Sequence, residues 1–259
     1  MSRAIRCFSR PRNVTSEITQ VTFQFRSLLR PGERLNRLIV GALAKAKKRY
    51  PIQLHAFVFL SNHFHILATF KNAKRMADFM RYFTQKLSKE VCVLHDWGDS
   101  VFPNRYHHVE LSEEATVDLA RLRYILTNSC KENLVLSPRD WPGVSSTKAL
   151  LTGEPMIGIW VDRTALGEAR RKKGGDKVSE EDFTEKLELR LEPVPSLAHL
   201  SPESYRKVIA GLVREIEQET IQRHRVDGTA PLGALAVLRR DPHYRPVEPP
   251  RSPRPWFTL

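Results

Sequence analysis

Residues 52–70, IQLHAFVFLSNHFHILATF, decide the fold. This stretch contains two apolar runs, 52–60 and 63–70, separated only by Ser61 and Asn62. Two such runs joined by a two-residue connection are typical of a β-hairpin. Because side chains alternate across a strand, His63 and His65 should project from one face and Phe64 from the other. The hairpin therefore predicts two imidazoles side by side on one face of a β-sheet.

The segments on either side of this hairpin alternate between strand and helix patterns. β-Branched and aromatic residues predict strands over 18–26 and 105–111. Apolar residues at helical spacing predict helices over 32–50, 73–91 and 112–130. The resulting order, β-α-β-β-α-β-α, is typical of a ferredoxin-like split βαβ fold. We therefore expect an α+β protein with a mostly antiparallel sheet and helices on one face.

The composition changes after about residue 165, which suggests three parts. The α+β domain should occupy 1–164. A linker is expected over 165–200, because 169–177 (ARRKKGGDK) is charged and contains a glycine pair. A helical and irregular extension should fill 201–259, with a helix from Ser201 to about residue 224 and a proline-rich, extended tail. Residues 131–160 should form loops and short irregular structure.

The chain is strongly basic, with a net charge of +13, and most of the excess lies near its start. Residues 1–50 hold 12 Lys and Arg against 2 Asp and Glu. Such a field favours a polyanion, and nucleic acid is the first candidate, although a solvated basic surface is the alternative. The candidate DNA contacts are Arg3, Arg6, Arg10, Arg12, Arg26 and Arg30, together with Lys74, Arg75, Arg81, Lys86 and Lys89 on the helix over 73–91.

Several classes of protein are disfavoured by what the sequence lacks. No apolar run approaches the ~20 residues that a membrane span needs, and the N-terminus has no signal-peptide pattern. The three cysteines are odd in number and far apart, which favours a reduced, cytoplasmic setting. No phosphate-binding glycine loop, zinc-protease motif or G-x-S-x-G motif occurs, so nucleotide hydrolysis, zinc proteolysis and α/β-hydrolase chemistry are disfavoured.

The helix over 112–130 carries Tyr124 and Asn128 on one face, nearly opposite its apolar stripe. They could be an ordinary solvent-facing pair. Alternatively, this face looks at the histidine strand, and Asn128 then offers an oxygen ligand beside a metal held by His63 and His65. Such an ion keeps positions open for a phosphate oxygen. Tyr124 could attack the phosphorus and form a covalent phosphotyrosine, which conserves the energy of the broken phosphodiester.

Three segments of this sequence resemble one family. HAFVFLSNHFHIL (55–67) resembles the His-hydrophobic-His core of the HUH single-tyrosine transposases. RYILTN (123–128) resembles the Tyr-Ile-x-x-Asn-Pro segment of their REP-associated tyrosine transposase branch, and WPGVSS (141–146) resembles its Trp/Pro-Ser-Ser segment. The resemblance covers the chain from about residue 15 to about residue 160. It departs from the family at Ser129, where the family has Pro, and in the displaced Trp141.

The resemblance implies a catalytic domain over 1–164 that acts on single-stranded DNA with Mg²⁺ or Mn²⁺. It implies Tyr124 as the nucleophile that becomes attached to a 5′-phosphate, and His63, His65 and Asn128 as metal ligands. The implied partner is single-stranded or hairpin DNA from palindromic repeats. We accordingly expect a cytoplasmic, nucleoid-associated protein, monomeric or homodimeric, without a membrane partner.

Two other functions fit parts of the sequence. A non-catalytic DNA-binding protein on the same fold, such as a repressor or nucleoid factor, would have no chemical need for all four site residues. A carboxylate-based nuclease is weaker, because the acidic residues in 51–130 do not cluster near the histidines in the sequence.

Overall fold

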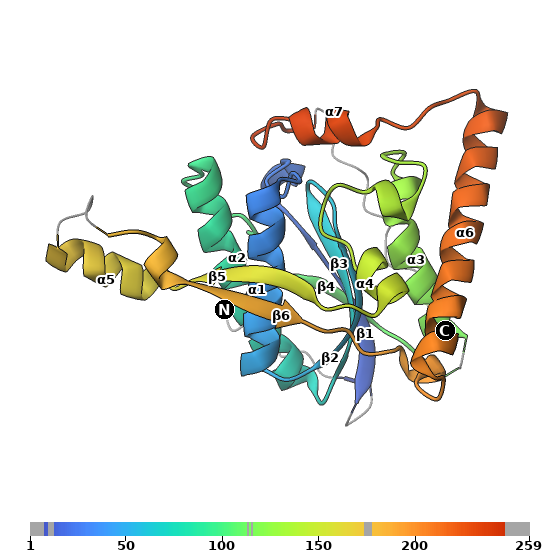
Figure 1. The fold of residues 1–259 in the computed structure, drawn as a ribbon, viewed down its shortest axis with the longest axis horizontal. Helices are drawn as coiled ribbons and strands as arrows, with labels where there is room; N and C mark the ends of the chain where they lie inside the picture. The colour runs from blue at the N-terminus through green and yellow to red at the C-terminus, as the bar shows by residue number, and fades with distance from the viewer. Residues whose placement is uncertain (1–7, 10–12, 113, 115, 174–177, 247–259) are drawn as a thin grey trace.

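A four-stranded antiparallel sheet lies at the centre of the computed structural model, which describes residues 8–9, 13–112, 114, 116–173 and 178–246 (Figure 1). Its strand order is β2-β3-β1-β4. The strands are β1 (Val14–Val21), β2 (Gln53–Phe59), β3 (His63–Phe70) and β4 (His107–Glu110). The chain order from β1 to α3 is the predicted split βαβ order. The predicted α+β class with a mostly antiparallel sheet is confirmed.

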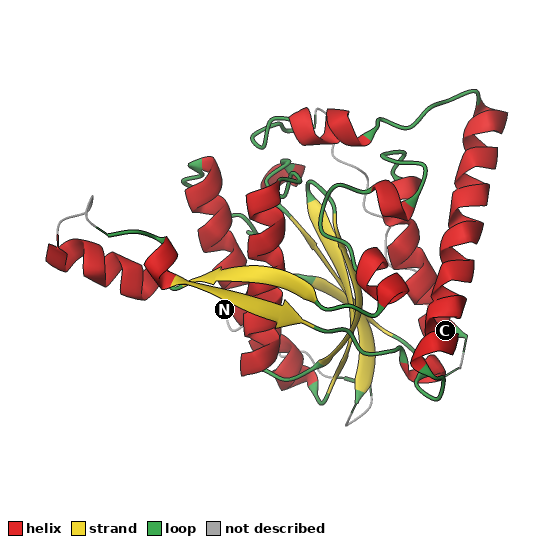
Figure 2. Cartoon of the chain, in the orientation of Figure 1, coloured by secondary structure: helices red, strands yellow, loops and turns green. Residues whose placement is uncertain are grey.

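Two long helices cover one face of this sheet, as Figure 2 shows. They are α1 (Glu33–Arg49) and α2 (Ala73–His95). Alternate residues of β2 and β3, including Phe57, Phe59 and Phe64, fill the core between the sheet and these helices. The rings of Phe59 and Phe64 stack with centroids 4.9 Å apart. At α2, the Asn72 side chain caps the helix by accepting a hydrogen bond from the Arg75 backbone N–H.

The opposite face of the sheet is covered by α3 (Val117–Lys131), which α6 (Pro202–Asp227) covers in turn. The sequence predicts helices on one face, and this is correct for α1 and α2. The helix predicted over 112–130, observed as α3, lies on the opposite face together with α6. The reason is that β2 and β3 are apolar on both faces: Val58 and Leu67 pack on the α3 side. A sheet with two apolar faces needs cover on both.

Residues 131–160 contain more regular structure than the sequence predicts. A short helix, α4 (Thr147–Thr152), is followed by strand β5 (Met156–Val161). The loop over 141–146, which precedes α4, runs along the outer edge of β2. There the Phe59 N–H donates to the Val144 carbonyl at 2.8 Å, and the Ser146 N–H donates to the Phe57 carbonyl at 2.9 Å. The predicted irregular structure is therefore correct for this loop and wrong for β5.

The prediction of a linker over 165–200 is also corrected by the structure. This segment contains most of α5 (Arg163–Lys173) and all of β6 (Thr184–Leu189), which pairs with β5 as an antiparallel ribbon across α1 (Figure 1). The charged sequence of β6, TEKLEL, has a weak strand pattern, because one side of the ribbon is exposed. Its pairing with β5 therefore comes from tertiary structure that the local sequence does not reveal.

The C-terminal part of the described chain is helical. The Ser201 side chain caps α6 by accepting from the Ser204 N–H, and Gly228 ends the helix in the left-handed region at φ 62°. The predicted helix from residue 201 is confirmed and extends to Asp227. It is followed by α7 (Ala234–Arg239), while nearly all of the predicted proline-rich tail lies outside the described residues.

The described chain also contains four short 3₁₀ segments: Phe23–Phe25, Pro138–Asp140, Glu181–Phe183 and Pro195–Leu197. Among the described helices, none combines the length and apolarity needed to cross a membrane.

The ribbon is seated on α1 by direct contact between two backbones. A Cβ atom added to Gly158 would lie 2.1 Å from the Gly41 nitrogen, and one added to Gly41 would lie 1.9 Å from the Ile159 carbonyl oxygen.

We expect Gly158→Ala to lower the free energy of unfolding by about 1–3 kcal/mol, because backbone atoms must move. Urea denaturation measures this change. Gly211→Ala, in α6 with nothing within 4 Å of the new methyl group, should instead stabilise by about 0.5–1 kcal/mol. Equal stabilities for Gly158→Ala and the unmodified chain would contradict the close contact.

Candidate active site

The register of the sheet places a set of polar side chains on the face that α3 covers. Cross-strand partners share a face, and His65 pairs with Thr19, which in turn pairs with His107. His63 and Glu17 lie two residues along their strands from His65 and Thr19, so they project from this same face. The alternation predicted for His63 and His65 is confirmed by this register.

One face of α3 looks at these side chains. Arg121, Tyr124, Asn128 and Lys131 are spaced three, four and three residues apart, so they share a helix face. The Tyr124 ring meets the His65 ring with centroids 5.7 Å apart and planes at 82°. The Arg121 guanidinium forms an ion pair of 2.7 Å with Glu17. Of the two placements that the sequence left open for Tyr124 and Asn128, the structure has the one that faces the histidine strand.

Both imidazoles are oriented by hydrogen bonds at Nδ1. The His65 Nδ1 lies 2.7 Å from Glu17 Oε1, and the His63 Nδ1 lies 2.7 Å from Asn62 Oδ1. Since these oxygens accept, each Nδ1 carries the proton and each Nε2 keeps its lone pair. Within the described part of the chain, neither Nε2 has a hydrogen-bond partner. Two adjacent rings, 5.2 Å apart between centroids, thus each present an unprotonated nitrogen.

His63 is held in its neutral form. Burial, with smaller contributions from His65 and Lys131, lowers the pKa of His63 to about 3. The imidazole is therefore uncharged at neutral pH, which is the form that binds a metal ion. An ordinary surface histidine has a pKa near ~6.5 and is partly protonated under mildly acidic conditions.

Glu17 is a site residue that the sequence analysis missed. Its side chain is buried, with 4% of the residue exposed, and it is held between His65 and Arg121. A carboxylate that accepts the Nδ1 proton fixes the tautomer of a metal-binding histidine and raises the basicity of its other nitrogen. Glu17 lies 48 residues before His65, so the two are not neighbours in the sequence. The strand predicted over 18–26 begins one residue too late to include Glu17, which lies in β1 (Val14–Val21).

The candidate third ligand, Asn128, is buried on the same helix face as Tyr124. Its amide Nδ2 donates to the Tyr124 carbonyl at 3.0 Å, which fixes the side chain and leaves Oδ1 as an acceptor. The described residues contain no group of three or more His, Cys, Asp or Glu side chains arranged for a metal ion. A metal at this site would therefore combine the two imidazoles with an oxygen ligand of another kind, and an amide oxygen fits a hard divalent cation.

Two cations flank the Tyr124 ring. The Lys131 Nζ lies 4.7 Å from the ring centroid and 3.5 Å from the hydroxyl oxygen. The Arg121 Cζ lies 5.4 Å from the same centroid on the previous turn of α3. The Arg121 charge is offset by its ion pair with Glu17. Lys131 has no ion pair among the described residues, so it would attract an anionic substrate to the phenol, which is the candidate nucleophile.

The basic residues predicted to contact DNA fall into distinct groups. Arg3, Arg6, Arg10 and Arg12 lie outside the described residues. Arg26 and Arg30 donate to the backbone carbonyls of His243 and Leu238, so they hold the segment that follows α6.

The basic residues of α2 lie on the side of the sheet away from the histidines. Lys74 and Arg81 both pair with Asp78 on α2. Arg75 and Lys86 instead lie over aromatic rings, and Lys89 is exposed.

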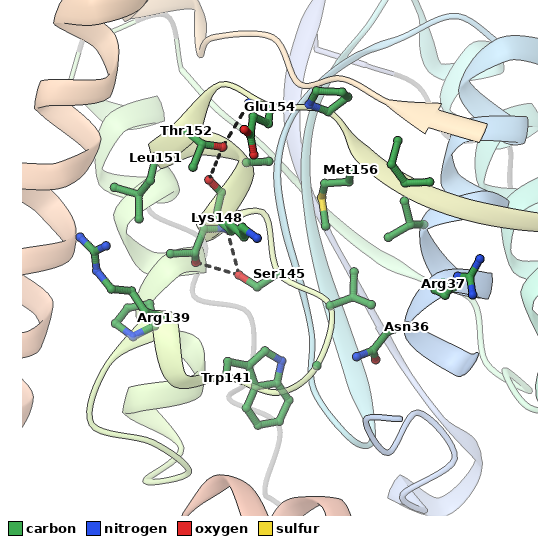
Figure 3. Close-up of a pocket in the computed structure, with 18 residues that line it drawn as sticks. Asn36, Arg37, Arg139, Trp141, Ser145, Lys148, Leu151, Thr152, Glu154 and Met156 are labelled. Atoms are coloured by element: carbon green, nitrogen blue, oxygen red, sulfur yellow. Dashed lines mark hydrogen bonds between the residues drawn. The ribbon is translucent and has the colours of Figure 1, made fainter. Parts of the chain in front are cut away.

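A buried histidine and a large cavity lie apart from this cluster. His55 is buried and satisfied by the Glu192 carbonyl and the Thr69 hydroxyl, as a structural histidine should be. The cavity, of about 690 Å³, lies between α1, α4 and β5, with Trp141 and Lys148 in its lining (Figure 3). None of the histidine-strand or α3 side chains lines this cavity, so it is separate from the candidate site.

The orientation of the imidazoles gives a test of metal binding. We expect His63→Ala and His65→Ala to abolish the binding of Mn²⁺, and Glu17→Gln to weaken it by about 10- to 100-fold, because the carboxylate that orients His65 is lost. Isothermal titration calorimetry measures the affinity. His199→Ala, at an exposed position before α6, is the control and should bind as the unmodified chain does. Unchanged affinity in both histidine variants would remove these residues from any metal site.

The similarity of this chain to known proteins is one of structure. No family model matches the chain, and no curated protein matches it. The chain is similar to a solved REP-associated tyrosine transposase bound to a REP hairpin, with 20% identity over 58% of this chain and 85% of that one and a TM-score of 0.44. It is also similar to a crystal structure assigned to a transposase of Deinococcus radiodurans R1, with 13% identity over 49% of this chain and 97% of that one and a TM-score of 0.34.

Proposed function

We propose that this protein cleaves single-stranded DNA and transfers the strand through a covalent 5′-phosphotyrosine intermediate on Tyr124. The observation that carries this proposal is the contact between Tyr124 and His65, at 5.7 Å between ring centroids. It joins a nucleophile to a pair of imidazoles whose Nδ1 protons are already engaged. A tyrosine that only faced solvent would not require an adjacent imidazole and two flanking cations.

The reaction is a transesterification that needs no oxidant, reductant or nucleotide. The Tyr124 hydroxyl oxygen attacks the phosphorus and forms an oxygen–phosphorus bond, while the bond to the 3′-oxygen breaks. The phenolic proton is lost to solvent and the departing 3′-oxygen gains one. The products are a 5′-phosphate on Tyr124 and a free 3′-hydroxyl. A second 3′-hydroxyl can reverse the reaction and reseal a different strand.

The side chains around Tyr124 have separate tasks in this step. Lys131, 3.5 Å from the hydroxyl oxygen, stabilises negative charge as it develops on the phenol and draws the phosphate in. Arg121 neutralises the buried Glu17, which in turn fixes the orientation of His65. His63, His65 and the Asn128 amide oxygen would hold Mg²⁺ or Mn²⁺. When bound, such an ion would polarise the phosphodiester and offset charge on its oxygens.

The proposed substrate is DNA that folds into hairpins beside an unpaired recognition sequence. This choice follows from the likeness of HAFVFLSNHFHIL (55–67) and RYILTN (123–128) to the transposase segments and from the basic character of the chain. Phosphate contacts would position the hairpin, and unpaired bases would give the sequence preference.

The proposal is tested with a labelled hairpin oligonucleotide taken from the DNA that flanks the gene, in the presence of Mn²⁺. We expect a slowly migrating covalent protein–DNA band on a denaturing gel. Tyr124→Phe should abolish this band and leave DNA binding within about twofold, because it removes only the hydroxyl group. Tyr106→Phe, on the loop before β4, is the matched control and should keep the band.

Two results would count against the proposal. A covalent band that persists in Tyr124→Phe would exclude this tyrosine as the nucleophile. Absence of a band with the unmodified chain, when binding of the same oligonucleotide is intact, would favour a DNA-binding protein that does not cut.

A further inference from the structure

A row of aromatic and basic side chains crosses the side of the molecule formed by α1, α2 and β5, away from the candidate active site. Three rings form the row: Tyr50 at the end of α1, Tyr82 on α2 and Trp160 on β5. Neighbouring ring centroids are 5.8 Å apart for Tyr50 and Tyr82, and 6.3 Å apart for Tyr82 and Trp160. In Figure 1 these three elements lie side by side, with β5 crossing α1.

Cations alternate with these rings, so we call the set the cation–aromatic ladder. Arg75 lies 5.9 Å from the Tyr50 centroid, and Arg49 lies 5.7 Å from Tyr50 and 5.3 Å from Tyr82. Beyond them, Lys86 lies 5.4 Å from both the Tyr82 and Trp160 centroids.

A fourth cation ends the ladder. Lys45 lies 5.5 Å from the Trp160 centroid. Each ring therefore lies between two cations contributed by α1 or α2.

The ladder fixes its cations without neutralising them. An aromatic face attracts a cation through its quadrupole but carries no net charge. Among the described residues, Arg49, Arg75 and Lys86 have no carboxylate within ion-pair distance. By contrast, Lys74 and Arg81 of α2 both pair with Asp78.

Three carboxylates act on the cations at the β5 end of the ladder. Glu185 of β6 pairs with Lys45 at 2.9 Å. Asp162, just after β5, and Glu90 of α2 act on Lys86 through their charges, and Glu90 is itself paired with Arg163. Asp78 acts on Arg75 in the same way from beyond ion-pair distance. Among the described residues, the ladder cations without an ion pair are therefore Arg49, Arg75 and Lys86.

We propose that the cation–aromatic ladder binds the phosphate backbone of single-stranded DNA, as a second nucleic-acid surface on the opposite side of the sheet from Tyr124. Repeated cations in a row match repeated phosphates, and partly exposed rings between them offer apolar surface to bases. This combination of a basic track and aromatic side chains is how proteins hold single strands with little sequence preference. The binding does not depend on tyrosine chemistry, so it can hold even where the proposed cleavage does not occur.

The close contact of β5 with α1 builds one end of the ladder. Trp160 of β5 contacts Tyr82, Lys45 and Lys86, and Glu185 of β6 pairs with Lys45. The contact between Gly41 and Gly158 brings β5 near enough to α1 for Trp160 to stack on Tyr82 with planes at 18°. The ribbon therefore contributes the third ring, Trp160, to a ladder whose other two rings lie on α2 and at the end of α1.

The test uses fluorescence anisotropy with a labelled oligothymidylate of about 16 nucleotides, which forms no hairpin. The ladder variant is Arg49→Gln, Arg75→Gln and Lys86→Gln in the full chain. We expect binding to weaken by about tenfold at low salt. The slope of log affinity against log salt should become shallower by about 2, because three phosphate contacts are lost.

The control variant removes the same charges elsewhere. Arg214→Gln, Arg225→Gln and Lys207→Gln take two arginines and one lysine from exposed positions on α6, and binding should stay within about twofold. Equal weakening in the two variants would show a general effect of net charge and would overturn the proposal. So would unchanged binding and salt slope in the ladder variant.

Further variants and a competitor identify what the ladder binds. The charge-conserving variant Arg49→Lys and Arg75→Lys should keep the salt slope, whereas loss of binding there would overturn a backbone-binding role. Thermal unfolding by circular dichroism checks that each variant is folded. Competition by polyglutamate as strong as that by unlabelled oligothymidylate would assign the ladder to acidic proteins and would also overturn the proposal.

Discussion

The alternation of side chains along β3 is the constraint on which the rest of the structure depends. Phe64 and Ile66 must enter the core beneath α1 and α2, so His63 and His65 must project from the opposite face. A shift in register by one residue would bury the imidazoles in the aromatic core and place Phe64 on the face that α3 covers. The apolar packing that stabilises the sheet thus also determines where its chemistry can occur.

The carboxylate of Glu17 can be buried on the second face because it has two partners there. Glu17 joins His65 to Arg121, so a helix and a strand are connected by a charged hydrogen-bonded chain within an otherwise apolar layer. An unpaired carboxylate in that position would be costly. The same layer places Tyr124 between two cations and against an imidazole. Stability and proposed reactivity therefore depend on overlapping contacts, and α3 cannot move away from β3 without losing both.

Local patterns were sufficient for the first half of the chain and insufficient for the second. The hairpin formed by 52–60 and 63–70, the helices around Leu43 and Phe83, and the order of elements along the chain follow from periodicity and short connections. The pairing of β6 with β5 does not, because TEKLEL has little apolar signal and its partner lies more than twenty residues earlier. Likewise, the spacing of His63, His65 and Tyr124 was readable, whereas Glu17 joins the site only through the register of β1 against β3.

The loop over 141–146 has a consequence for how this protein can associate. Sheets in many proteins grow by adding a strand from another molecule to an unpaired edge. Here the outer edge of β2 already receives backbone hydrogen bonds from this loop, and the Trp141 indole donates to the Phe59 carbonyl at 3.0 Å. An incoming strand would have to displace that loop. Copies of this chain that meet on the β2 side must therefore recognise each other through side chains, and continuous sheets between molecules are blocked at that edge.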